Sequence, residues 1–154
     1  MKKLFILFAF LIIGLSSCQK VYVSKLRIQQ AAIDDQKIQD YMKANNITAT
    51  KDASGLYYKV VTPGTDPKPI ITSTVKLTYT TEYLNGISIG KIDGATARLN
   101  TFVGAIQAGV PKIGTGGRII LIVPSGLAYG EADHGGIPAN SVILYTIDLD
   151  GFSN

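Results

Sequence analysis

The chain has 154 residues and a formal net charge of +4, with 15 Lys and Arg, 11 Asp and Glu, one Cys, one His and no Trp. This length is enough for one domain with a real hydrophobic core. A single Cys excludes an internal disulfide, and the lack of a basic cluster or an Arg-rich helix gives no reason to expect a nucleic-acid partner.

The first residues have the pattern of an export signal. Two lysines precede an apolar run over residues 4–15, which is shorter than the roughly 20 residues of a membrane-spanning helix. Leu15-Ser16-Ser17-Cys18 then resembles a bacterial lipobox, which implies that Cys18 becomes the lipidated first residue of the mature protein. We expect a signal peptide over residues 1–17 and a membrane anchor on Cys18, held by more than one acyl chain. The alternative is that Cys18 is an incidental residue of the signal.

Residues 18–55 are expected to form a tether and an N-terminal helical extension. The helix is predicted over residues 27–44, which are rich in Gln, Ala, Asp and Lys. Its apolar residues fall at helical spacing: Ala31, Ile38, Tyr41 and Met42. Residues 48–55 are polar and typical of turns.

Strand patterns begin at residue 56. Residues 56–61 form one strand candidate, and residues 75–83 alternate apolar and polar side chains as a half-buried strand does. Asn85-Gly86 indicates a turn. Residues 90–99 have no clear period and are interpreted as a loop or an irregular edge segment.

The last third of the chain contains a short helix and two strands. The helix is expected over residues 101–112, although two glycines and a proline weaken it. A turn over residues 114–117 leads to a strand at 119–123, and a final strand alternates over residues 143–149. Four or five antiparallel strands with one helix before the last two predict an α+β fold, with a sheet wrapped on a helix. We assign it to residues 56–154.

The sequence between these last two strands carries the most specific pattern. Residues 124–149 read PSGLAYGEADHGGIPANSVILYTIDL, and this ordered run resembles the C-terminal half of an FKBP-type peptidyl-prolyl cis-trans isomerase domain. The resemblance extends over residues 56–149. It implies an FKBP-like twisted antiparallel β-sheet wrapped on one short central helix, preceded by a short N-terminal helical extension. It also implies a small apolar basin that binds peptides without a metal or cofactor.

The same resemblance assigns roles to individual residues. Tyr129 matches the Tyr of the AYG signature, whose hydroxyl donates to the bound peptide. Val103 takes the second place of the Val-Ile pair that opens the central helix, where the backbone N–H binds a substrate carbonyl. Tyr79 falls in the first wall of the pocket. Further substrate-binding positions match Ile89, Phe102, Ile106, His134, Ile137 and Tyr145.

Three positions depart from the family pattern. Ile89 and Gly90 stand where the family has a bulky aromatic residue followed by Asp, and Ile106 replaces a Trp at the pocket floor. These changes keep the basin apolar but remove a polar group and a large flat surface. Weak turnover is therefore expected.

Plainer readings exist for some of these residues. In a domain of unknown type, Tyr79, Phe102 and Tyr145 would be interpreted as core. His134 is expected to lie in the flap loop rather than on a metal, because the chain has no second His and Cys18 is not usable.

Two functions follow. The first is a peptidyl-prolyl isomerase that assists the folding of exported or envelope proteins, with proline-containing polypeptides as partners. The second is an FKBP-fold peptide-binding or chaperone module with little turnover. In either case the lipid anchor implies the bacterial cell envelope, and Gln19 after the Cys favours the outer over the inner membrane by the sorting rule of enteric lipoproteins.

Overall fold

The computed structural model describes residues 25–154. The expected signal peptide, Cys18 and the first part of the tether lie outside the described residues. An N-terminal helix is described over residues 25–44, so two residues expected in the tether are helical. The elements that follow are β1 (Thr50–Lys51), β2 (Tyr57–Thr62), β3 (Thr74–Tyr83), β4 (Ser88–Arg98), η1 (Leu99–Thr101), α2 (Gly104–Gly109), η2 (Val110–Lys112), β5 (Arg118–Val123), η3 (Ser125–Leu127) and β6 (Ile143–Ser153).

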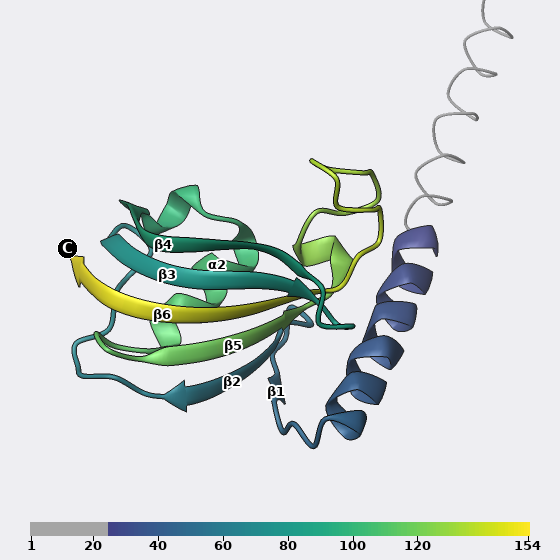
Figure 1. The fold of residues 1–154 in the computed structure, drawn as a ribbon, viewed down its shortest axis with the longest axis horizontal. Coiled ribbons are helices and arrows are strands. Elements are labelled where there is room, and N and C mark those ends of the chain that lie inside the picture. Colours follow the sequence, from purple (N-terminus) through teal and green to yellow (C-terminus); the bar gives the residue numbers. More distant parts are fainter. Residues whose placement is uncertain (1–24) are drawn as a thin grey trace, which may run out of the picture.

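The strands form one antiparallel sheet of six, in the order β1-β2-β5-β6-β3-β4 (Figure 1). The sheet twists and curves across α2, which lies on one of its faces, while the N-terminal helix stands beside the end of the sheet that carries β1. The α+β prediction is confirmed.

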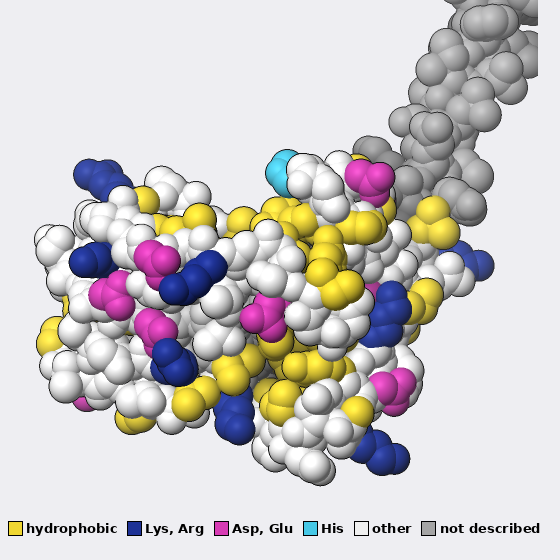
Figure 2. Space-filling model, in the orientation of Figure 1, with side chains coloured by type: hydrophobic (Ala, Val, Ile, Leu, Met, Phe, Trp, Pro, Cys, Tyr) yellow, Lys and Arg dark blue, Asp and Glu magenta, His cyan; other side chains and the backbone are white. Residues whose placement is uncertain are grey.

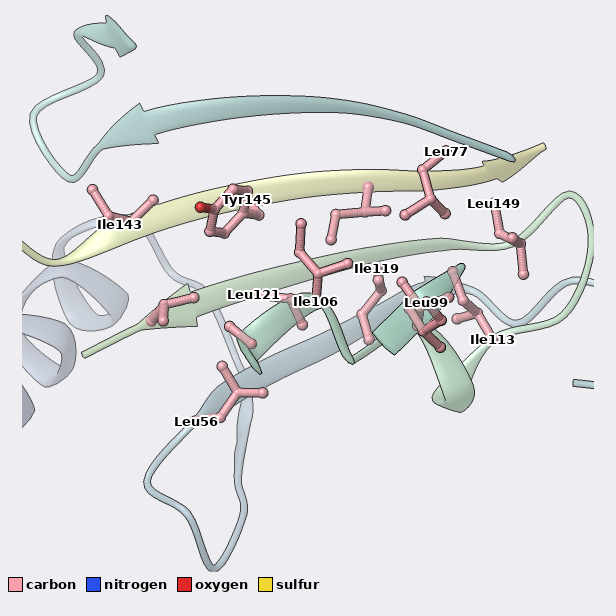
Figure 3. Close-up of a cluster of buried hydrophobic side chains, with 14 of the residues drawn as sticks. Leu56, Leu77, Leu99, Ile106, Ile113, Ile119, Leu121, Ile143, Tyr145 and Leu149 are labelled. Carbon is pink, nitrogen blue, oxygen red and sulfur yellow. The ribbon is translucent and has the colours of Figure 1, made fainter. Parts of the chain in front are cut away.

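Side chains that alternate along each strand divide the interior into two clusters. On β5, Ile119 and Leu121 face α2, while Ile122 faces the N-terminal helix. Figure 3 shows the larger cluster, in which Ile106 points from α2 toward the sheet and Tyr145 lies on β6 above it. Both faces of β5 are therefore covered, which explains its continuous apolar sequence.

The smaller cluster holds the N-terminal helix on the sheet. Ile38 is completely buried and packs with Tyr57, Ile122 and Val142. Tyr41 and Met42 of the predicted apolar stripe are partly buried against this cluster, whereas Ala31 is exposed.

Residues 90–99 were expected to form a loop or an irregular edge segment; the loop is wrong, and the irregular edge segment is confirmed. Residues 90–98 belong to β4, an edge strand of 11 residues that pairs with β3, and Leu99 begins η1. Most of its side chains are exposed, and the register shifts near Tyr79 and again near Glu82. Such shifts interrupt the two-residue period, so no alternation was visible in the sequence.

The helix expected over residues 101–112 is also shorter than predicted. The α-helical part has six residues, with a 3₁₀ turn on either side. Pro111 lacks the N–H that would continue the α-helical hydrogen bonds. Gly109 is nevertheless required, since a Cβ there would lie 2.7 Å from methyl carbons of Leu121. The glycine lets α2 approach β5 closely.

The surface charge is mixed. Figure 2 shows basic and acidic side chains interspersed over the sheet, with hydrophobic side chains gathered between the sheet and the N-terminal helix. Arg118 makes two hydrogen bonds to Asp148 across β5 and β6, at 2.6 and 2.8 Å. Within residues 25–154, no helix is both long and apolar enough to cross a membrane.

Candidate functional site

A cavity of about 390 Å³ opens between the β3–β4 part of the sheet and the start of α2. It is mainly apolar, with tyrosine side chains on its walls. The residues that line it are Tyr79, Thr81, Ile89, Gly90, Ile92, Thr101, Phe102, Val103, Ile106, Tyr129 and Tyr145. The sequence placed most of these in one pocket, and the structure brings them together.

Two of the expected pocket residues do not line the cavity. Ile137 is buried, with 6% of its surface exposed, and packs in the larger core cluster. His134 is exposed, and its ring stacks on the ring of Tyr129, with centroids 5.4 Å apart. The backbones of His134 and Ile137 exchange two hydrogen bonds of 2.9 Å, which closes the loop between them into a tight turn. This turn supports Tyr129 from outside the cavity.

Two tyrosines from neighbouring strands form one wall. Tyr79 of β3 meets Tyr145 of β6 edge to face, with centroids 6.2 Å apart and an interplanar angle of 63°. Burial raises the pKa of both hydroxyl groups, and the hydrogen bond with Tyr129 raises the pKa of Tyr145 further. Both phenols therefore stay protonated at neutral pH and keep an O–H to donate.

The floor of the cavity comes from α2. Ile106 is 2% exposed and belongs to the core as well as to the cavity. Gly90 also lines the cavity, and a Cβ built on it would meet no atom within 4 Å. The structure thus leaves room for a side chain at residue 90 and little room at residue 106.

Val103 lines the cavity at the start of α2. Val103 is the N-cap residue, with φ −61° and ψ 149°, and its carbonyl accepts hydrogen bonds from the N–H groups of Ile106 and Gln107. Its own N–H donates to no other residue within 25–154. The Gln107 side chain donates to the carbonyl of Phe102 at 2.7 Å and fixes the approach to the helix. Sequence reasoning missed this role of Gln107.

Tyr129 reaches the cavity from the segment that follows η3. The carbonyl of Ser125 accepts hydrogen bonds from the N–H groups of Ala128 and Gly130, at 3.0 and 2.9 Å, on either side of Tyr129. Gly130 has φ +80°, a conformation that favours glycine. The Tyr129 hydroxyl lies 3.3 Å from the Tyr145 hydroxyl. This turn therefore holds the phenol at the cavity wall.

Sequence reasoning also missed two cavity residues on the strands. Thr81 follows Tyr79 at the two-residue spacing of β3, so the alternation already contained the signal for it. Ile92 was hidden by the register shift that aligns it with Tyr79.

The arrangement suits an apolar peptide segment with carbonyl groups. It combines apolar walls, a backbone N–H without a partner among the described residues, and phenolic O–H groups. Among residues 25–154, no three His, Cys, Asp or Glu side chains are grouped so as to hold a metal ion.

Comparison with known proteins places this chain in a family. The model of the FKBP-type peptidyl-prolyl cis-trans isomerase family matches residues 66–150, which is more than half of the chain. The chain belongs to this family. The match begins after β2, although β2 pairs with β5 within the same sheet.

Individual relatives agree with this assignment. An FKBP-type peptidyl-prolyl cis-trans isomerase, FkpA, from Aeromonas hydrophila is 33% identical over 136 residues, covering 82% of this chain and 50% of the relative. FkpA from Escherichia coli K12 is 29% identical over 127 residues, covering 79% and 47%. The chain thus spans about half the length of the curated relatives it matches.

Solved structures show the same fold. The crystal structure of FkpA from Escherichia coli matches with a TM-score of 0.71 and 27% identity, covering 81% of this chain and 62% of that one. A peptidyl-prolyl cis-trans isomerase from Pseudomonas syringae pv. tomato matches with a TM-score of 0.68 and 22% identity, covering 80% and 96%. The predicted FKBP-like fold is confirmed.

Proposed function

We propose that this chain catalyses the cis–trans isomerisation of X–Pro bonds in polypeptides and so assists their folding. The observation that carries the proposal is the apolar cavity with the unused Val103 N–H at its wall. The family of the chain and the FkpA name of its relatives support it.

The reaction needs no nucleophile. Rotation about a peptide bond faces a barrier of about 18–20 kcal/mol, because the planar amide is stabilised by resonance. Uncatalysed X–Pro exchange takes tens to hundreds of seconds. An apolar cavity disfavours the charge-separated planar amide relative to the twisted transition state, in which the C–N bond is nearly single. Such a site accelerates rotation by binding the transition state better than the ground state.

The lining residues divide this work between them. Ile106 and the ring of Tyr79 pack against the pyrrolidine ring and exclude water. The Val103 N–H and the Tyr129 O–H bind backbone carbonyls on either side of the proline, which orients the bond for rotation. Phe102 and Ile89 extend the apolar contact toward the rim.

We further propose that the protein works in the bacterial cell envelope as a lipoprotein. The basic and apolar segment before Leu15-Ser16-Ser17-Cys18 supports a signal peptide over residues 1–17 and lipid on Cys18. Its clients would then be exported proteins that fold near the membrane surface, more often at the outer membrane than the inner.

A second function is favoured by a specific observation. Gly90 leaves the rim without a carboxylate, and Ile106 gives the floor a small side chain in place of a flat aromatic ring. A cavity of this kind binds proline segments while turning them over slowly. The second candidate is therefore a peptide-binding or chaperone module with an FKBP fold.

One experiment separates the two functions. The full-length chain in detergent is added to a proline tetrapeptide, and the cis–trans exchange rate and peptide binding are measured by NMR. Acceleration that grows in proportion to protein concentration supports the isomerase. Saturable peptide binding with exchange at only the uncatalysed rate supports the binding module instead. The absence of both binding and acceleration overturns both proposed functions.

A further inference from the structure

A buried carboxylate lies in the interface between the N-terminal helix and the FKBP-type domain. Asp34 lies one helical turn before Ile38, on the helix face that packs against the sheet, and its side chain is completely buried. One carboxylate oxygen accepts hydrogen bonds from the N–H and the hydroxyl of Ser125, at 2.8 and 2.6 Å. The other accepts from the Gln30 side chain at 2.8 Å. A buried carboxylate is stable only with such partners.

Ser125 is the residue that organises the backbone around Tyr129. Its N–H and hydroxyl are held by Asp34, and its carbonyl accepts hydrogen bonds from Ala128 and Gly130. A continuous set of hydrogen bonds therefore runs from the N-terminal helix to the two neighbours of Tyr129.

The ring of Tyr129 is held at its other end by side-chain contacts. It stacks on His134, and its hydroxyl meets that of Tyr145. These contacts fix the ring only while the turn over residues 125–130 keeps its place. Asp34 lies outside this turn and accepts hydrogen bonds from both the N–H and the hydroxyl of its first residue, Ser125.

We propose that Asp34 is a positioning residue for Tyr129. By binding Ser125, the N-terminal helix sets the turn that places the Tyr129 hydroxyl at the cavity wall. The inference rests on the proposed function for its effect on catalysis, but its structural part does not. The helical extension is then part of the working site as well as a support for the sheet.

The neighbouring residue provides a matched control. Asp35 is also a hydrogen-bonded carboxylate on the same helix, but it binds Lys51 and the Tyr57 hydroxyl, which lie on β1 and β2. Removing either carboxylate weakens the attachment of the helix to the sheet. Only the loss of Asp34 should reach Tyr129.

The first test reads the position of the Tyr129 ring without any activity. His134 is the only histidine of the chain, so its ring protons give a single set of signals in the full-length protein labelled with ¹³C-histidine, in detergent. The stacked tyrosine shifts these signals from their free values. Asp34→Ala and Ser125→Ala should move them toward the free values, while Asp34→Asn, which keeps an oxygen for the Ser125 N–H, should restore most of the wild-type shift. Asp35→Ala should leave them in place.

The second test measures isomerase activity in a double-mutant cycle. Asp34→Ala should lower kcat/KM by about three- to tenfold, on the scale of a lost hydrogen bond. In the Tyr129→Phe background the same change should cost less than about twofold, because residues that act through one group are not additive. Ser125→Ala provides the same cycle if Asp34→Ala does not fold.

The outcomes separate this inference from the proposed function. Signals of His134 that stay unchanged in folded Asp34→Ala and Ser125→Ala overturn the inference, as does an equal loss in both backgrounds. A wild-type chain without isomerase activity overturns the proposed catalysis alone, and the His134 signals then decide whether Asp34 positions Tyr129.

Discussion

The hydroxyl oxygens of Tyr129 and Tyr145 lie 3.3 Å apart, and Tyr145 is 2% exposed. A buried hydroxyl needs a partner, and within residues 25–154 Tyr145 has only this one. Since a phenol donates one hydrogen bond and accepts others, Tyr145 can donate to Tyr129 and leave the Tyr129 proton free. A peptide carbonyl in the cavity can then accept it.

This pairing predicts a non-additive effect on stability. Tyr129→Phe leaves the Tyr145 hydroxyl buried and unpaired, which should lower the free energy of unfolding by about 1–3 kcal/mol. Phe at both positions removes both polar groups and should cost clearly less than the sum of the single changes. Urea unfolding of the three variants measures the difference. Kinetically, Tyr129→Phe should lower kcat/KM about tenfold, and the hypothesis fails if Tyr145→Phe alone has the larger effect.

The Val103 N–H can be removed by a single substitution that the backbone already accommodates. Val103 has the φ of a proline, −61°, and the residue before it is extended, as a residue before proline must be. We expect Val103→Pro to fold with unchanged or slightly higher stability and to lose about tenfold in kcat/KM, because a substrate carbonyl loses its donor.

Val103→Ala is the control for this change, since it shortens the side chain and keeps the N–H. Its activity should stay within about threefold of wild type. Equal losses in the two variants would show that the side chain matters and the N–H does not.

Much of the fold was readable from side-chain alternation, and the exceptions have physical causes. The strand at residues 75–83 alternates because one face of β3 is buried, and Tyr79 and Thr81 fall on that face. The edge strand β4 is paired on one side and mostly exposed, so its residues carry no period. Its register shifts also place Ile92 at the cavity, which the sequence pattern did not predict.

The site was partly predictable for a different reason. The ordered run after Pro124 pointed to Tyr129 and the family pattern to Val103 and Tyr79, and all three line the cavity. That pattern concerns the pocket, so it gave no sign of Asp34, which belongs to the preceding helix. A carboxylate within an apolar stripe was the available signal, and its partner Ser125 lies 91 residues away in the sequence.

The attachment of the N-terminal helix to β1 and β2 should depend on pH. Hydrogen bonds from Lys51 and then from Tyr57 hold the pKa of Asp35 below its usual value of 3.8. Its contribution to stability is therefore present above about pH 4 and is lost as the pH falls through the folded-state pKa. Asp35→Asn should lower the free energy of unfolding by about 1–2 kcal/mol at neutral pH, and the deficit should shrink in acid.

Urea unfolding between pH 7 and pH 3 measures this deficit. Asp40→Asn is the matched control, because Asp40 lies on the same helix, is exposed and accepts only from Gln36 among the described side chains. Its stability should stay within about 0.5 kcal/mol of wild type. A deficit for Asp35→Asn that is constant over this range would contradict the ionic origin.

The proposed lipid anchor on Cys18 leads to a prediction about processing. Cys18→Ala removes the thiol that would carry the lipid, so the variant should remain unprocessed or appear in the soluble fraction. Membrane fractionation with detergent partitioning, together with the mass of the N-terminal peptide, measures this. Ser17→Ala, which keeps the thiol and a small residue before it, should still be processed and partition into detergent. Unchanged processing of Cys18→Ala would exclude lipidation at this residue.

The departures at Gly90 and Ile106 predict that catalysis can be improved. A Cβ at Gly90 meets nothing within 4 Å, so Gly90→Asp should fold normally and add a hydrogen-bonding group to the rim, worth about 1 kcal/mol or roughly a fivefold gain in kcat/KM. Ile106→Trp would add flat surface for the pyrrolidine ring, worth about 0.5–1.5 kcal/mol. However, Ile106 is buried in the core, so this variant should lose about 1–3 kcal/mol of stability by overpacking.

Gly90→Ala controls for the backbone at the first site, because it adds a Cβ without a carboxylate and should leave kcat/KM near the wild-type value. The exchange rate of a proline tetrapeptide and the urea midpoint are measured for each variant. Gains both for Gly90→Asp and for Gly90→Asp combined with Ile106→Trp would show that these two residues limit catalysis in the wild-type chain. If Gly90→Asp binds the peptide as wild type does and exchange remains uncatalysed in both, the cavity acts as a binding site for proline segments.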